Sequence, residues 1–219
     1  MNVLGLDMSS QKSGYSVFKD GKLWKYGVWE MSSKDEPDWR KRIAYMSEQV
    51  QECCKKYGIR EIYAEDVPPI LENTQTVKVL SALQGMLIAT SVLYDIDIHF
   101  VPVKTWKSKI GINLDASKEN HALKKNIKAR FGANAKPKLN TVKGWVRGWE
   151  KKMSVDYAND LFGIELVYKS PTSKFNQDDI ADSINVAWSQ IGDVKPYSLD
   201  TFEHITENFY ELIIQTSFT

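Results

Sequence analysis

The sequence predicts an α/β fold with a mixed sheet, in which three antiparallel strands come first, parallel strands follow, and helices flank the sheet. Three observations predict it. Short apolar runs and a hairpin signal, Asp20-Gly21, fill the first 30 residues. After them, segments of helical and strand periodicity alternate. The length of 219 residues suits one generous domain, or one domain with a sizeable insertion.

The first seven elements can be read in order from these patterns. Residues 3–7, 14–18 and 23–29 predict the antiparallel strands, and residues 39–57, with apolar side chains at helical spacing, predict a helix. Gly58 stands where a C-cap glycine belongs. A fourth strand over 59–65, a helix over 74–94 and a fifth strand over 96–101 complete the alternation.

The pattern loosens after Val103 into a basic stretch that contains tryptophans. A helix is expected to begin near Asp178 and to continue to Trp188, and another is expected over 201–214. We therefore predict one domain over 1–190 with a basic insertion at about 118–176, and a C-terminal helical extension over 191–219.

Charge is distributed unevenly along the chain. The formal net charge is +1, yet residues 103–152 hold 14 Lys and Arg against 3 Asp and Glu. The remainder holds 15 basic and 25 acidic side chains. Such a division predicts a surface that binds a polyanion and a separate region where carboxylates gather. The alternative is a dipolar surface that only maintains solubility.

Several other function classes are disfavoured. No apolar run approaches the ~20 residues of a membrane span, and the N-terminus lacks the layout of a secretory signal, so a cytoplasmic location is expected. The adjacent Cys53 and Cys54 suit neither a disulfide nor a zinc site. We expect them to be unreactive helix residues.

Four acidic residues stand where packing alone would not favour them. Asp7 and Glu65 each end an apolar strand, and Asp179 and Asp182 share one face at the start of a helix. A carboxylate at the end of a buried strand is costly to desolvate unless a cation or hydrogen-bond donors compensate. Taken singly, each has a structural explanation: a turn for Asp7, an exposed strand end for Glu65, and a helix cap for the pair.

Together the four carboxylates predict a metal site. Strand ends and a helix N-terminus can converge in a mixed sheet, and carboxylates without histidine or cysteine suit Mg²⁺, with Mn²⁺ as the alternative. Two such ions would support phosphodiester hydrolysis. Whether the neighbouring Asp66 or Asp178 joins the metal ligands is left open by the sequence.

The same residues carry a resemblance to a known family. The segments LGLDMSSQKSGYSVF, IYAEDV and DDIADSINVA resemble the RuvC family of Holliday junction resolvases, within the ribonuclease H-like superfamily. The resemblance covers roughly residues 1–120 and 176–190. It implies a ribonuclease H-like fold, with Asp7, Glu65, Asp179 and Asp182 as catalytic metal ligands, and Lys107 and Lys118 near the lysines that the family keeps beside its active site.

The resemblance also implies partners and a reaction. A homodimer would bind a four-way DNA junction and nick two strands symmetrically, using divalent metal. Two features depart from the family. Pro68 stands where the family commonly has an aromatic residue, and the segment over about 118–176 is longer, as in versions carried by bacteriophages. A looser specificity for branched DNA is therefore expected, and a bacterial host cytoplasm if a phage encodes the chain.

The basic stretch supports a nucleic-acid partner. Its cations are expected to neutralise phosphates: Lys104, Lys107, Lys109, Lys118, Lys124, Lys125, Lys128 and Arg130. Trp145, Arg147 and Trp149 interleave aromatic and cationic groups, as a surface that stacks on unpaired bases would. The alternative is that the tryptophans pack a small core within the insertion.

Three other readings compete with a junction resolvase. An actin-like or sugar-kinase-like phosphotransferase also begins with an Asp in a Gly/Ser turn, but it needs a second related half, which the sequence lacks. A non-catalytic junction-binding module is disfavoured because all four carboxylates are present. The third is a broad-specificity flap or fork endonuclease of the same fold.

Overall fold

A mixed five-stranded sheet forms the centre of the computed structural model, which describes residues 1–67, 73–114 and 118–197. The strand order is β3-β2-β1-β4-β5. Strands β1, β2 and β3 pair antiparallel, whereas β1, β4 and β5 run parallel, which confirms the predicted fold class. The bounds are β1 Asn2–Asp7, β2 Lys12–Lys19, β3 Lys22–Glu30, β4 Glu61–Glu65 and β5 Asp97–Val101.

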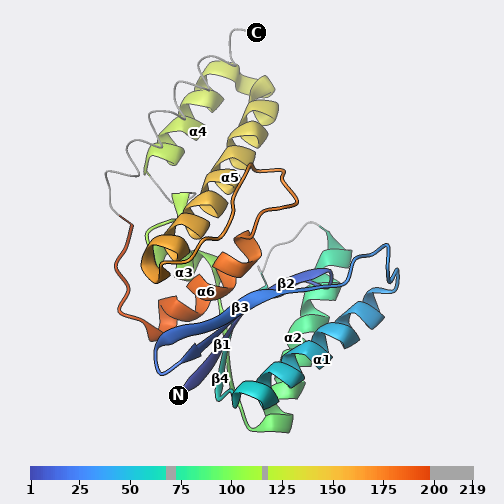
Figure 1. The fold of residues 1–219 in the computed structure, drawn as a ribbon. Coiled ribbons are helices and arrows are strands. Elements are labelled where there is room, and N and C mark those ends of the chain that lie inside the picture. Colours follow the sequence, from blue (N-terminus) through green and yellow to red (C-terminus); the bar gives the residue numbers. More distant parts are fainter. Residues whose placement is uncertain (68–72, 115–117, 198–219) are drawn as a thin grey trace.

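Helices cover both faces of the sheet (Figure 1). On one face α1 and α2 enclose a core with Leu4, Leu6 and Ile62. On the other face α6 packs across the sheet, and α3 and α5 lie beyond it. The bounds are α1 Trp39–Tyr57, α2 Thr74–Tyr94, α3 Val103–Lys109, α4 Lys118–Phe131, η2 Gly132–Asn134, α5 Ala135–Phe162 and α6 Asp178–Ile191.

Local chemistry fixes the ends of α1. The Asp38 side chain accepts a hydrogen bond from the backbone N–H of Arg40 at the N-terminus, and Gly58 takes a left-handed conformation with φ of 58° at the C-terminus. This confirms the predicted C-cap. Cys53 and Cys54 are buried free thiols on the inner face of the helix, also as predicted.

Helix α2 corrects one sequence-based expectation. By length and composition alone it could cross a membrane, so the prediction that no apolar run approaches this length was wrong for residues 74–94. In the fold, α2 buries Leu83 and Leu87 against the sheet and contacts α1 and β5. Its opposite face leaves Ile88, Val92 and Leu93 exposed.

The region after Val103 is more ordered than predicted. It forms α3, α4 and the 28-residue α5, where the sequence pattern indicated only a loose stretch. Pro137 lies in the first turn of α5, where a missing backbone N–H costs no helical hydrogen bond. The helix expected over 201–214, and most of the extension over 191–219, lie outside the described residues.

Candidate active site

Asp7 and Glu65 end two neighbouring parallel strands. Leu6 of β1 is paired with Ala64 of β4, so the residues that follow them leave the sheet at the same edge. Asp7 is itself paired with Gly14 of β2. The topology therefore brings the first two predicted acids together at the carboxyl ends of β1 and β4, as expected.

Helix α6 brings the other two acids to this edge. Its first turn crosses β2 so closely that a Cβ atom at Gly14 would lie 1.8 Å from the carbonyl oxygen of Asp179. Ser16 on β2 reinforces this approach, because its Oγ donates to the carbonyl oxygen of Ser183 at 2.9 Å. The absence of a side chain at Gly14 thus allows Asp179 and Asp182 to approach the end of β1.

The four carboxylates repel one another. Asp7, Glu65 and Asp182 keep some contact with solvent, yet burial is the largest cause of a raised pKa at each. Repulsion from Glu65, Asp182 and Asp179 adds to burial at Asp7 and raises its pKa well above the usual range. Burial and repulsion from Asp182 raise the pKa of Glu65 to about 7. The pKa of Asp182 is raised to about 6.

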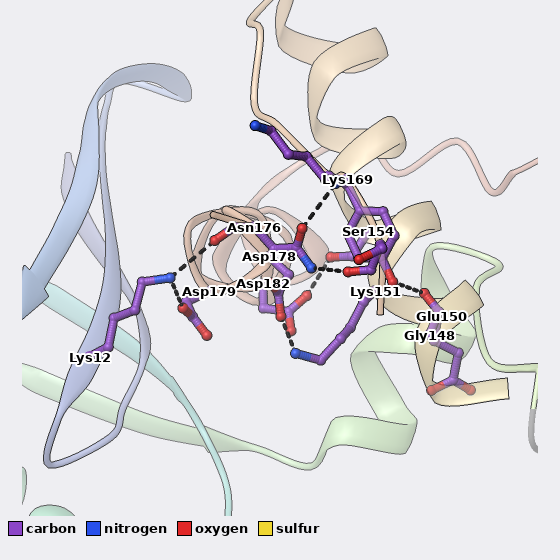
Figure 2. Close-up of polar contacts among 12 residues, drawn as sticks. Lys12, Gly148, Glu150, Lys151, Ser154, Lys169, Asn176, Asp178, Asp179 and Asp182 are labelled. Atoms are coloured by element: carbon purple, nitrogen blue, oxygen red, sulfur yellow. Dashed lines mark hydrogen bonds and ion pairs between the residues drawn. The ribbon is translucent and has the colours of Figure 1, made fainter. Parts of the chain in front are cut away.

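Three hydrogen-bonding or ion-pair contacts hold these acids in place. Nε1 of Trp106 donates to Oε1 of Glu65 at 3.0 Å, and Nζ of Lys12 lies 2.6 Å from Oδ2 of Asp179. The hydroxyl of Ser154, on α5, donates to Oδ1 of Asp182. Figure 2 shows Lys12 approaching α6 from the β1–β2 side and Ser154 from the opposite side. Glu65, Asp179 and Asp182 are therefore each oriented by a partner from a different element.

Lys107 places a cation beside the acids. Its ammonium group donates to Oε2 of Glu150 at 3.0 Å, and both side chains are largely buried. Burial lowers the pKa of Lys107, but attraction to Asp182, Glu150 and Glu65 outweighs it, so the pKa is raised. Lys107 consequently stays charged at neutral pH.

The sequence left open whether Asp66 or Asp178 joins the metal ligands, and the structure gives these two acids different surroundings. Asp66 turns away and accepts a hydrogen bond from Nε2 of Gln84 at 2.8 Å. Asp178 is buried, adds to the repulsion at Asp7 and Asp182, and forms an ion pair with Lys151. Lys118 begins α4, but its side chain lies outside the described part of the chain, as does Pro68.

The donor set fits a hard divalent cation by its chemistry. Within the residues that the structure describes, the candidate metal ligands at this edge are carboxylate oxygens, with no histidine or cysteine, and such oxygens are the ligands of Mg²⁺ and Mn²⁺. Their mutual repulsion shows that the nearby lysines leave negative charge uncompensated. Among the described residues, no group of three or more acidic, histidine or cysteine side chains already forms a metal-binding set. Small side-chain movements would therefore have to accompany binding.

Comparison with known proteins places the fold. No family model and no curated protein matches the sequence. Two solved structures match the fold over 90% of this chain and 100% of theirs: Thermus thermophilus RuvC in complex with a Holliday junction substrate, at 11% identity and a TM-score of 0.57, and Thermus thermophilus RuvC, at 14% and 0.53. The chain has the RuvC fold.

On this RuvC fold, sequence reasoning missed five residues that shape the site. They contact the four acids, the neighbouring Asp178 or Lys107: Lys12, Trp106, Glu150, Lys151 and Ser154. Three of them lie on α5, which the sequence did not predict as a helix. A signal existed only for Trp106, since a buried indole N–H needs an acceptor and the residue adjoins Lys107.

The repulsion predicts how the stability of the metal-free protein depends on pH. The folded-state pKa values of Asp7, Glu65 and Asp182 exceed their unfolded values, so the folded state holds more protons between about pH 4 and 7. The contribution to stability is therefore present at low pH and is lost as pH rises through this window. We expect the melting temperature in EDTA to fall between pH 5 and 8, and to fall less in Glu65→Gln. A melting temperature that rises over this range in wild type would contradict the assignment.

Proposed function

We propose that the chain is a divalent-metal-dependent endonuclease that cleaves branched DNA, with Holliday junctions as the expected substrate. The observation that carries this proposal is the convergence of four acids at one edge of a RuvC-type sheet: Asp7 and Glu65 end neighbouring parallel strands, and α6 brings Asp179 and Asp182 against them. These four acids would hold Mg²⁺ or Mn²⁺. When bound, the ion supplies Lewis-acid activation of the phosphodiester and of the attacking water.

The protein's own residues have separate tasks in this reaction. Lys107, fixed by Glu150, would bind a non-bridging oxygen of the scissile phosphate and stabilise the charge that develops there. Trp106 and Ser154 would keep Glu65 and Asp182 in the orientation that coordination requires. Lys118 is assigned a supporting role by the family resemblance alone.

A substrate panel tests the proposal. Labelled four-way, three-way, flap, fork and linear duplexes are incubated with the protein in Mg²⁺, in Mn²⁺ and in EDTA. We expect paired nicks in four-way junctions, weaker cleavage of other branched DNA, and none in EDTA. Preference for flaps or forks would favour the broader endonuclease, and binding without cleavage would favour a junction-binding module. Failure to bind any branched DNA would refute the proposed nuclease and the junction-binding module alike.

We also propose that the protein acts as a homodimer through α2. Ser81, Gly85, Ile88 and Val92 recur at helical spacing along its exposed face, and a Cβ atom at Gly85 would meet nothing within 4 Å. Such a stripe of small and apolar residues suits close packing against the same helix of a second copy. Symmetric nicking of two strands would require two active sites. The cytoplasmic location, in a bacterial host if phage-encoded, stays a prediction.

A charge placed on this face should separate the two copies. Val92 is 81% exposed, so Val92→Glu costs little in the monomer but buries a carboxylate in the dimer. We expect light scattering at micromolar concentration to give a dimer for wild type and a monomer for Val92→Glu. Lys55→Glu, at the end of α1, serves as the control. A monomeric wild type would refute the dimer.

A further inference from the structure

One helix joins the acidic site to the most basic part of the chain. Helix α5 spans 28 residues, which is about 42 Å. Toward its C-terminal end, Ser154 and Lys151 contact Asp182 and Asp178 of α6. Toward its N-terminal end, α5 packs against α4, and the two helices extend together away from the sheet (Figure 1).

Helix α4 and the N-terminal part of α5, residues 118–147, form the basic arm. It contains nine Lys and Arg and a single acidic residue, Glu119. Phe131, Leu139, Val142 and Val146 join it to the core that also holds Trp106, so the arm is a packed extension of the domain. Five of its cations are exposed and make no ion pair within the described part of the chain: Lys125, Lys128, Lys136, Lys143 and Arg147.

The cations of α5 form a stripe that leads to the acids. Lys136, Lys143 and Arg147 are separated by seven and four residues, so they share one face of the helix. Ser154 follows Lys136 by eighteen residues, which is five complete turns, and therefore lies on the same face. The face that meets Asp182 at one end is consequently a row of exposed cations at the other.

The length of this row matches a short stretch of duplex. Lys136 and Ser154 are about 27 Å apart along the helix axis, at 1.5 Å for each residue. B-form DNA rises about 3.4 Å for each base pair, so the row corresponds to about eight base pairs. The acidic side chain that follows these cations on α5, Glu150, is bonded to Lys107. Exposed lysines and an arginine in a row suit phosphates and carry no sequence information.

We infer that the basic arm binds the backbone of the duplex arm next to the cleavage site, over about eight base pairs, and so holds the substrate's branch against the acids. This inference rests on the proposed nuclease function and adds the surface that orients the DNA. The arm would contact the duplex backbone and not the phosphate that is cleaved. Its loss should therefore weaken binding of branched DNA.

The test reverses charge on the stripe. Lys136→Glu/Lys143→Glu/Arg147→Glu is compared with a matched control, Lys55→Glu/Lys56→Glu/Arg60→Glu, whose exposed residues lie where β4 begins, at the far end of the strand from Glu65. Binding of a labelled four-way junction is followed by fluorescence anisotropy in EDTA from 50 to 300 mM salt. Circular dichroism verifies folding, and a glutamine version of the triple variant replaces it if the glutamate version unfolds.

We expect the stripe variant to lose about 100-fold in affinity, and the salt dependence of log K to become shallower by about 2.7, which is three lost phosphate contacts. Footprinting should show wild-type protection of about eight base pairs beside the cleavage site, absent in the variant. A stripe variant that binds like the control, with wild-type binding intact, would overturn the inference and leave the proposed function standing. A wild type that binds no branched DNA would instead remove both.

Discussion

Asp7→Asn is expected to reduce cleavage of branched DNA by on the order of 10³-fold or more while leaving DNA affinity within about twofold of wild type. Four neighbouring carboxylates repel the carboxylate of Asp7 and, together with burial, raise its pKa. An asparagine keeps the shape but removes the charge that would attract the cation. The basic arm and Lys107 remain, so the substrate still binds. Single-turnover cleavage and anisotropy measure the two quantities separately.

The same change should raise the stability of the metal-free protein. Removing one member of a set of repelling carboxylates relieves the repulsion at Glu65 and Asp182, and each kcal/mol gained raises the melting temperature by roughly 2–4 °C in a chain of this size. Asp66→Asn is the matched control, because Asp66 bonds to Gln84 and is not among the main causes of the raised pKa values at the site. Cleavage by Asp7→Asn at the control's rate would show that Asp7 holds no catalytic cation.

Gly14→Ala is expected to destabilise the fold strongly. The added Cβ would lie 1.8 Å from the carbonyl oxygen and 2.3 Å from the carbonyl carbon of Asp179, and both belong to the backbone of α6. Helix α6 would have to move by more than 1 Å, and such overpacking costs about 3 kcal/mol or more. Thermal unfolding should show a melting temperature lower by roughly 6–12 °C.

The displacement of α6 should also reduce cleavage by the folded fraction, since Asp179 and Asp182 move with the helix. Gly144→Ala provides the control, because a Cβ atom there meets nothing within 4 Å and alanine favours a helix interior over glycine. That variant should melt slightly higher than wild type. If Gly14→Ala melted within 2 °C of wild type, the close approach of α6 to β2 would not be what places the acids.

The sequence predicted those elements whose structure is determined by residues close together in the chain. The hairpin at Asp20-Gly21, the apolar spacing of α1 and the C-cap at Gly58 each specify structure within a few residues. The acids at the ends of β1 and β4 followed from the same reasoning, since an apolar run that ends in a carboxylate marks both the strand end and the unusual charge.

Helix α5 shows where such reasoning fails. Gly144 and Gly148 normally argue against a helix. Tertiary packing overrides this preference, because Val142 and Val146 pack into the core shared with α3, and Gly148 is crowded by the side chain of Pro171. The sequence left open whether Trp145 and Trp149 form a surface for unpaired bases or pack a core. Trp149 packs on that core, while Trp145 is 36% exposed.

The contacts made by α5 could not be predicted because they join distant parts of the chain. The bond from Ser154 to Asp182 spans 28 residues, and the one from Lys107 to Glu150 spans 43. Nothing near Ser154 in sequence distinguishes it from a serine that only faces a neighbouring helix. Such partners become visible when the packing of α5 against α6 is known.

Anomalous diffraction from crystals soaked in Mn²⁺ tests the central claim most directly, because it locates the ion independently of activity. We expect an anomalous peak within coordination distance of Asp7 and Glu65, bordered by Asp179 and Asp182, and absent in Asp7→Asn crystals. If wild-type protein cleaves branched DNA in Mn²⁺, yet its crystals at saturating Mn²⁺ bind the ion elsewhere, then these four carboxylates are not the metal site.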